Sequence, residues 1–142
     1  MSIEAQISHM KTLWPRFRVH HVERGFQAAQ WVGVAQPQFT QYTLQIRYRV
    51  GAAPQVRILA PALVRLPENP EGQLPHVFPP ASDPTLCLYD PDLDQWNWTM
   101  AIADTIVPWA FDWIACYEFW LITGRWYGGG RHAGDPLPAV KA

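Results

Sequence analysis

The chain has 142 residues and a formal net charge of -1, so it carries no basic surplus for binding a phosphate backbone, and nucleic acid is disfavoured as its main ligand. Apolar residues make up 49% of the composition, which predicts a globular domain with a core of its own. The apolar run 106–122 contains Pro108, Asp112 and Glu118, which excludes a membrane span. With two cysteines and no secretory leader evident, we expect a reduced protein in the cytoplasm.

The first predicted element is an amphipathic helix that starts after Ser2 and ends at Pro15. Its apolar residues recur every three or four positions and therefore share one face: Ile3, Ile7, Met10 and Trp14. Two strand-like segments follow within residues 17–35, separated by residues 23–25. We expect Gly25 to supply the positive φ that a tight hairpin needs.

The clearest strand pattern covers residues 42–50, where apolar and polar residues alternate strictly. A period of two predicts a half-buried antiparallel strand with its polar face in water. After a turn at residues 51–54, the alternation repeats in a shorter segment that contains Val56, Ile58 and Ala60. Together these patterns predict a four-stranded antiparallel meander.

Residues 61–91 contain more than half of the fourteen prolines. Because proline removes a backbone donor and restricts φ, we expect ordered irregular chain here rather than sheet or helix. A loop of this length is usually functional when it is ordered. Its apolar side chains can anchor it on the core: Phe78, Leu86, Leu88 and Tyr89.

A long, aromatic-rich helix is predicted from Asp104 to about Thr123, with Gly124 as its stop and Pro108 near its first turn. It is apolar on nearly all sides, which is typical of a buried helix. Glycine and proline punctuate the last residues, so we expect one domain at 1–127 and a C-terminal tail at 128–142. The whole pattern predicts an α+β fold.

The order of three short motifs links these elements to a known family. A His-Val-Phe-Pro run at 76–79 is followed by a Leu-Cys-Leu run at 86–88, a Trp-Asn-Trp run at 96–98 and the long helix. This order resembles the ubiquitin-conjugating-enzyme fold, in which a His-Pro-Asn motif lies shortly before the catalytic cysteine. The resemblance spans roughly residues 1–123 and implies an N-terminal helix, a four-stranded antiparallel meander, an active-site loop and a long central helix.

Within that superfamily the chain is similar to bacterial ubiquitin-conjugating-like proteins encoded in cyclic-oligonucleotide antiphage (CBASS) operons, beside a cGAS-like nucleotidyltransferase. The similarity is carried by residues 76–79, 86–91, 102–109 and 123–132. It implies that Cys87 takes the C-terminus of the nucleotidyltransferase as a thioester and passes it to an amine, which primes the synthase. This chemistry needs no metal or organic cofactor, and the resemblance leaves open whether an adenylating enzyme activates the donor carboxylate.

The chain departs from the family motif at one place. Val77 and Phe78 stand where the family has Pro-Asn, so the asparagine amide is absent there. Asn97 can replace that amide if the fold brings it close. His76, and with less support His132, can donate a hydrogen bond to the developing oxyanion.

Three aspartates follow the cysteine: Asp90, Asp92 and Asp94. A carboxylate can accept the proton of an attacking lysine or hold its ammonium nearby. Neighbouring carboxylates raise a thiol pKa rather than lower it, which suits a carrier that stays unreactive until an activated acyl group arrives. Turn formation is the default role of such aspartates, and their spacing lacks the glycine and glutamate of a calcium loop.

Other interpretations stay open. Cys87 can be an apolar filler, His76 a residue that pins its loop, and His132 a solvated tail residue. Cys116 lies within the predicted long helix, where packing in the core is expected. The rival functions are a noncatalytic binding module on the same fold, a cysteine peptidase and an oligomer built through the tryptophan-rich helix.

Overall fold

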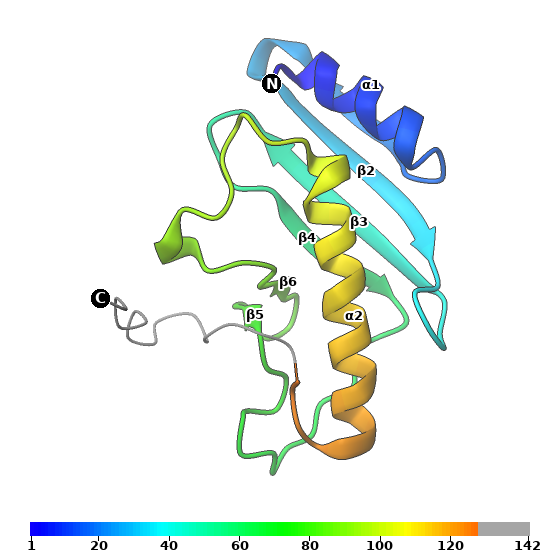
Figure 1. The fold of residues 1–142 in the computed structure, drawn as a ribbon, viewed down its shortest axis with the longest axis vertical. Helices are drawn as coiled ribbons and strands as arrows, with labels where there is room; N and C mark the ends of the chain where they lie inside the picture. Colours follow the sequence, from blue (N-terminus) through cyan, green and yellow to red (C-terminus); the bar gives the residue numbers. More distant parts are fainter. Residues whose placement is uncertain (128–142) are drawn as a thin grey trace, which may run out of the picture.

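The structure, a computed structural model, describes residues 1–127. In this range helices α1 (Ile3–Leu13) and α2 (Ile106–Thr123) pack with one antiparallel sheet. Its strands pair in chain order: β1 (Arg18–Glu23), β2 (Ala28–Ala35), β3 (Tyr42–Arg49) and β4 (Gln55–Ala60). Both helices lie on the same side of the sheet (Figure 1). The predicted α+β, ubiquitin-conjugating-enzyme-like architecture with its four-stranded meander is confirmed.

Helix α1 starts where the sequence predicts. The Ser2 side chain caps it by accepting a hydrogen bond from the backbone N–H of Ala5 at 3.1 Å. Ile3 and Met10 are fully buried on one face, and the helix ends at Leu13, just before Trp14. This face attaches α1 to the rest of the core.

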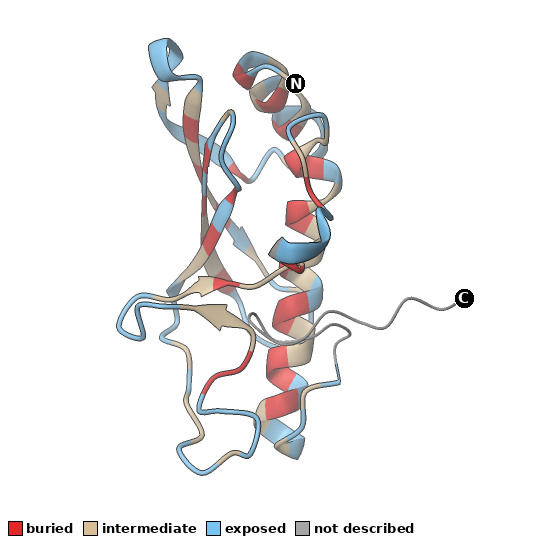
Figure 2. Cartoon of the chain, turned by 90° about the vertical axis from the view of Figure 1, so that its left-hand side faces the viewer, coloured by how far each residue is buried: buried red, intermediate tan, exposed pale blue. Residues whose placement is uncertain are grey.

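The sheet places its apolar side chains toward the helices. In β3 the alternate residues Tyr42, Leu44, Ile46 and Tyr48 are buried, while Arg47 and Arg49 are exposed. Figure 2 shows the sheet and the helices edge-on, with buried segments on the surfaces that face each other. One face of the sheet therefore builds the core, and the other meets water.

The β1–β2 connection differs from the prediction. Residues Arg24–Phe26 form a 3₁₀ turn, and the left-handed residue is Gln27, with φ 50°, rather than Gly25. The Gln27 side chain donates to the carbonyl of Arg24 and accepts from the N–H of Ile3. These bonds hold Gln27 in a conformation that glycine would otherwise be expected to supply.

The proline-rich crossing also contains more regular structure than predicted. Strands β5 (Val77–Phe78) and β6 (Thr85–Leu86) pair antiparallel as a small hairpin, and β6 contacts β4. A 3₁₀ turn, η2 (Pro91–Leu93), follows the hairpin. Strands of two residues are too short to show an alternating pattern, which is why the sequence did not indicate them.

Helix α2 starts two residues later than predicted, because Ile102–Asp104 form a separate 3₁₀ turn, η3. It ends as expected at Gly124, whose φ is 75°. Its core-facing residues are buried: Ile106, Val107, Ala110, Trp113, Ile114, Tyr117 and Trp120. No helix within residues 1–127 combines the length and apolarity that crossing a membrane requires.

Gln6 fastens α1 to the segment before α2. Its side chain is only 1% exposed; it accepts from the N–H of Ile102 at 2.9 Å and donates to the carbonyl of Met100 at 2.8 Å. A buried amide is stable when both of its ends are paired, as they are here. The start of α2 is therefore fixed relative to α1.

Candidate active site

Cys87 directly follows β6, and His76 directly precedes β5. The backbone N–H of Cys87 donates to the carbonyl of His76 at 2.8 Å, which extends the β5–β6 ladder by one pair. His76 and Cys87 are eleven positions apart in the sequence, and the hairpin between them places them opposite each other.

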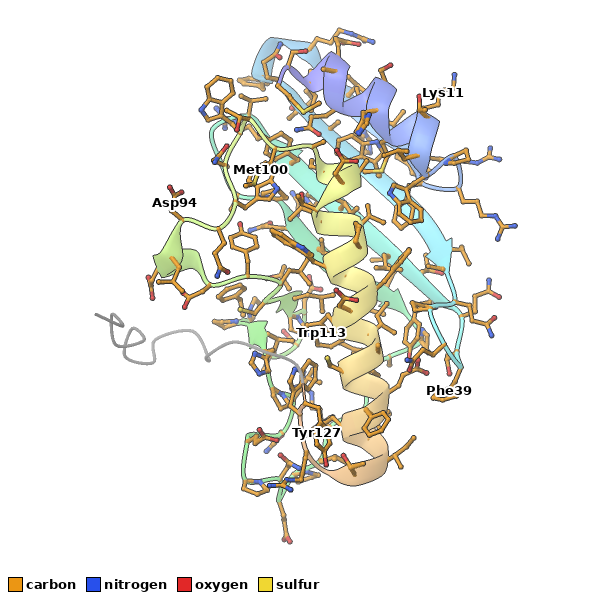
Figure 3. All side chains as sticks on the ribbon, viewed as in Figure 1. Lys11, Phe39, Asp94, Met100, Trp113 and Tyr127 are labelled. Atoms are coloured by element: carbon orange, nitrogen blue, oxygen red, sulfur yellow. The ribbon has the colours of Figure 1, made fainter. Side chains whose placement is uncertain are left out.

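Helix α2 holds this end of the hairpin in place. The indole Nε1 of Trp113 donates to the same His76 carbonyl at 2.9 Å, so one oxygen accepts from both the hairpin and the helix. Figure 3 shows Trp113 on α2 facing the hairpin. His76 adopts a left-handed backbone, with φ 56°, that residues other than glycine seldom take. The two hydrogen bonds help to stabilise that conformation.

We predict that Trp113→Phe lowers the free energy of unfolding by about 1 kcal/mol more than Trp120→Phe does. Both changes remove the same atoms from the core, but the buried Nε1 of Trp120 has no partner in the described chain, so only the first loses a hydrogen bond. Urea unfolding of the two variants measures the difference. Equal destabilisation of the two variants would show that the bond from Trp113 to His76 makes no net contribution to the free energy of unfolding.

The thiol borders an open pocket of about 130 Å³. The hairpin and the residues after it form one wall, and α2 forms the other with residues spaced by three or four positions. The pocket is lined by His76, Cys87, Leu88, Trp109, Asp112, Trp113, Cys116 and Trp126. Since the rings of His76 and Trp126 pack with centroids 5.0 Å apart, the segment after α2 completes the rim.

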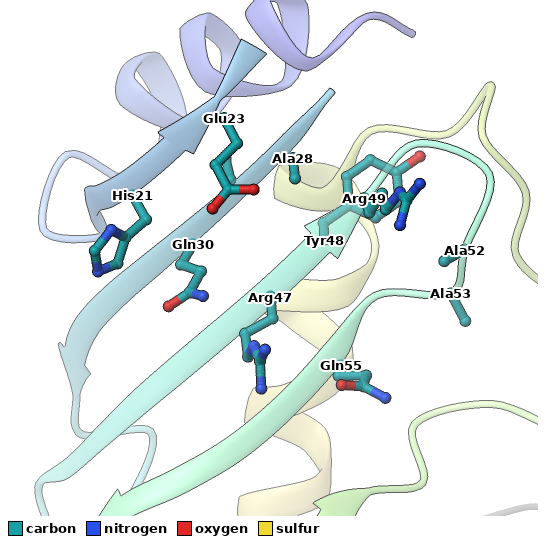
Figure 4. Close-up of a pocket in the computed structure, with 11 residues that line it drawn as sticks. His21, Glu23, Ala28, Gln30, Arg47, Tyr48, Arg49, Ala52, Ala53 and Gln55 are labelled. Carbon is teal, nitrogen blue, oxygen red and sulfur yellow. The ribbon is translucent and has the colours of Figure 1, made fainter. Parts of the chain in front are cut away.

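A larger concavity of about 320 Å³ lies on the outer face of the sheet, with α2 behind the strands (Figure 4). Its lining is about half polar and includes His21, Glu23, Gln30 and Arg47. Neither cysteine borders it. We therefore place the candidate active site at the smaller pocket, where a nucleophile is present.

The Cys87 thiol is half-buried, and its Sγ lies 3.4 Å from the carbonyl oxygen of Tyr89. Burial raises the pKa of this thiol, and the negative charge of Asp90 raises it further. The sequence-based expectation that neighbouring carboxylates raise the pKa is confirmed. At neutral pH the group is therefore mainly the protonated thiol.

Asp90→Asn is expected to make Cys87 react several-fold faster with iodoacetamide at neutral pH. Removing the negative charge stabilises the thiolate, so the thiol pKa falls and the curve of rate against pH moves to lower pH. Asparagine can still cap the turn that follows. Asp94→Asn, a change at an exposed residue that does not line the pocket, is the control. Superimposable curves for the Asp90 variant and the wild type would contradict this electrostatic account.

The other candidates lie around the pocket rather than in it. Asp90 is buried; its carboxylate accepts from the N–H of Asp92, and its N–H donates to Gln95. Asp92 is exposed within η2, and Asp94, which follows η2, is exposed and projects from the loop in Figure 3. The Asn97 side chain accepts from the N–H of Thr99, holding a local turn. His132 lies outside the described residues.

Several pocket residues were not predicted as site residues. Trp109, Asp112 and Trp113 belong to the α2 wall, and Trp126 to the rim. The helical spacing of the first three was visible in the sequence, but an aromatic stripe usually indicates core packing. Within residues 1–127, no three histidine, cysteine, aspartate or glutamate side chains are grouped so as to hold a metal ion.

A family model described as "Type II CBASS E2 protein" matches residues 6–133, which include both walls of the pocket. The chain belongs to the type II CBASS E2 family. No curated protein matches the chain significantly. Family membership confirms the resemblance inferred from the motif order and assigns this E2 a conjugating-enzyme-like role in antiphage defence, together with other CBASS proteins.

Proposed function

We propose that this type II CBASS E2 accepts the C-terminus of a cGAS-like nucleotidyltransferase on Cys87 as a thioester and transfers it to an amine. The observation that carries this proposal is the placement of the Cys87 thiol at an open pocket between the hairpin and α2. The His76 carbonyl accepts from the N–H of Cys87 and from the indole of Trp113, which ties the cysteine backbone to α2 through His76. A peptide terminus needs an accessible sulfur held in a defined position, and this pocket offers one.

Loading requires a donor that is already activated, because a free carboxylate has no leaving group that a thiol can displace. An acyl adenylate or thioester supplied by an upstream adenylating enzyme meets this need. The Cys87 sulfur attacks the carbonyl carbon, a C–S bond forms, the donor's leaving group departs, and the thiol proton leaves with it. We assign the ring of His76, which lines the same pocket, as the donor to the oxyanion of this step.

The raised thiol pKa disfavours a cysteine peptidase. A peptidase lowers the pKa of its cysteine through an imidazolium partner, whereas Cys87 is shifted in the opposite direction. A carrier that exchanges activated acyl groups tolerates this shift, because the acyl donor supplies the driving force.

A noncatalytic binding module is the alternative function. It is favoured by apolar side chains that remain exposed near the end of α2, with Phe119 at 49%, Ile122 at 72% and Tyr127 at 62%. A patch of this kind can bind a partner protein without any chemistry at Cys87.

Co-expression with the nucleotidyltransferase of the same operon tests the proposal. We expect a covalent adduct on denaturing gels that excess thiol reductant releases. Cys116→Ser is the matched control, because Cys116 borders the same pocket and its thiol pKa is also raised by burial. The control should keep the adduct. An adduct that maps to Cys116, or that survives in Cys87→Ala, would refute the assignment.

A further inference from the structure

Asp112 is an acidic residue in the α2 wall of the Cys87 pocket. It shares the helix face of Trp109, Trp113 and Cys116, and all four line the pocket. Its side chain is exposed and takes part in none of the ion pairs between described residues. Glu118, the other acid of α2, is buried and lies 3.4 Å from the backbone N–H of Phe39. Asp112 therefore offers an accessible carboxylate on the wall opposite the thiol.

The aspartates that follow Cys87 are placed differently. Asp90 is the charge that raises the thiol pKa, but its carboxylate is buried and accepts from the backbone of η2. Asp92 and Asp94 do not line the pocket. Of the acids considered, Asp112 combines exposure with a position on the pocket wall.

The surroundings of Asp112 favour a cation. Trp109 and Trp113 flank it on the helix and line the same pocket. Aromatic walls exclude part of the water that would screen a carboxylate. An amine that enters as an ammonium is thus attracted by the charge of the carboxylate.

We infer that Asp112 makes a cationic primary amine, such as the side chain of lysine, the preferred acyl acceptor of this site. The inference rests on the proposed function, since it concerns the second half of the transfer. Asp112 pairs with the incoming ammonium and so raises the occupancy of a charged amine in the pocket that holds the acyl group on Cys87.

The step balances with the groups in the pocket. An ammonium that has lost one proton to solvent attacks the thioester carbon, a C–N bond forms, and the nitrogen becomes cationic. The C–S bond breaks, and the extra proton of the nitrogen passes through solvent to the departing thiolate of Cys87. The products are an amide and the free thiol, and Asp112 stays ionised throughout.

Single-turnover discharge tests the inference with small probes. Cys87 in a Cys116→Ser background is first acylated with the benzyl thioester of acetylglycine, and loading is followed by intact-protein mass spectrometry. The loaded protein is then mixed with Nα-acetyl-lysine amide or with hydroxylamine, which is uncharged at neutral pH. For Asp112→Asn we expect unchanged loading, discharge to the lysine derivative slower by about fivefold, which is the scale of one exposed ion pair, and unchanged discharge to hydroxylamine.

Two variants and the pH profile complete the test. Asp112→Glu should restore part of the lysine rate, and Asp94→Asn should match the wild type. The rate of discharge to the lysine derivative should become similar in Asp112→Asn and in the wild type as the pH approaches the lysine pKa of about 10.4, because the amine loses its charge there. If Cys87 cannot be loaded at all, the proposed function fails. If loading succeeds but Asp112→Asn slows neither amine, or slows both equally, the role of Asp112 is refuted and the proposed function stands.

Discussion

A Cys87→Ala variant is expected to fold like the wild type and to lose acyl transfer to the nucleotidyltransferase, by a factor of at least about 10⁴. Alanine fits the half-buried position, so the stability change is limited to the weak contact between Sγ and the Tyr89 carbonyl. The nucleophile, in contrast, is removed completely. Conjugate formation in co-expressing cells and urea unfolding of the purified variant measure the two effects separately.

Cys116→Ala is the control for this substitution. It removes the second thiol of the same pocket and should leave conjugation intact. Full antiphage protection by Cys87→Ala would instead favour the noncatalytic binding module, with the exposed side chains near the end of α2 as its contact surface.

His76→Gly is expected to slow acylation of Cys87 by about 10²-fold, the scale of one lost oxyanion donor. Glycine adopts the left-handed backbone of residue 76 without strain and keeps the carbonyl that accepts from Cys87 and Trp113. The change therefore removes the imidazole while preserving the hairpin. The rate of loading from a small thioester, measured by intact mass, reports the loss.

His76→Asn provides the comparison. Asparagine tolerates positive φ and carries an amide that can donate, so part of the rate should return. If His76→Gly loads at the wild-type rate, the ring has no part in the chemistry and residue 76 acts through its backbone alone.

Helix α1, the meander and α2 could be predicted because each carries a local, periodic signal. The alternation at residues 42–50 became strand β3, and the spacing of Ile3 and Met10 became the buried face of α1. Such patterns depend on which side of an element faces the core and need no knowledge of the rest of the chain.

The β5–β6 hairpin and the left-handed Gln27 could not be predicted in this way. Two-residue strands show no period, and the conformation of Gln27 depends on a hydrogen bond to Ile3, which is distant in sequence. Asx turns and 3₁₀ turns in the loop after Cys87 likewise come from specific side-chain bonds, as at Asn97.

Only some of the residues that line the pocket could be predicted from the sequence. Motif order pointed to Cys87 and His76, and the structure brings both to one pocket. Asp112 and Trp113 come from a helix whose aromatic residues suggested only a core, and their position opposite the thiol follows from tertiary packing. The acids chosen from the sequence were those close to Cys87 along the chain, whereas the pocket takes Asp112 from another element.

The most direct test of the thioester proposal is a Cys87→Ser variant co-expressed with the nucleotidyltransferase and analysed by tandem mass spectrometry. Serine forms an oxygen ester, so we predict either an adduct at residue 87 that reductant no longer releases or the absence of any adduct. The wild type run in parallel should show the reductant-labile form at the same residue. A reductant-labile adduct that persists in Cys87→Ser would show that another thiol carries the acyl group and would contradict the account.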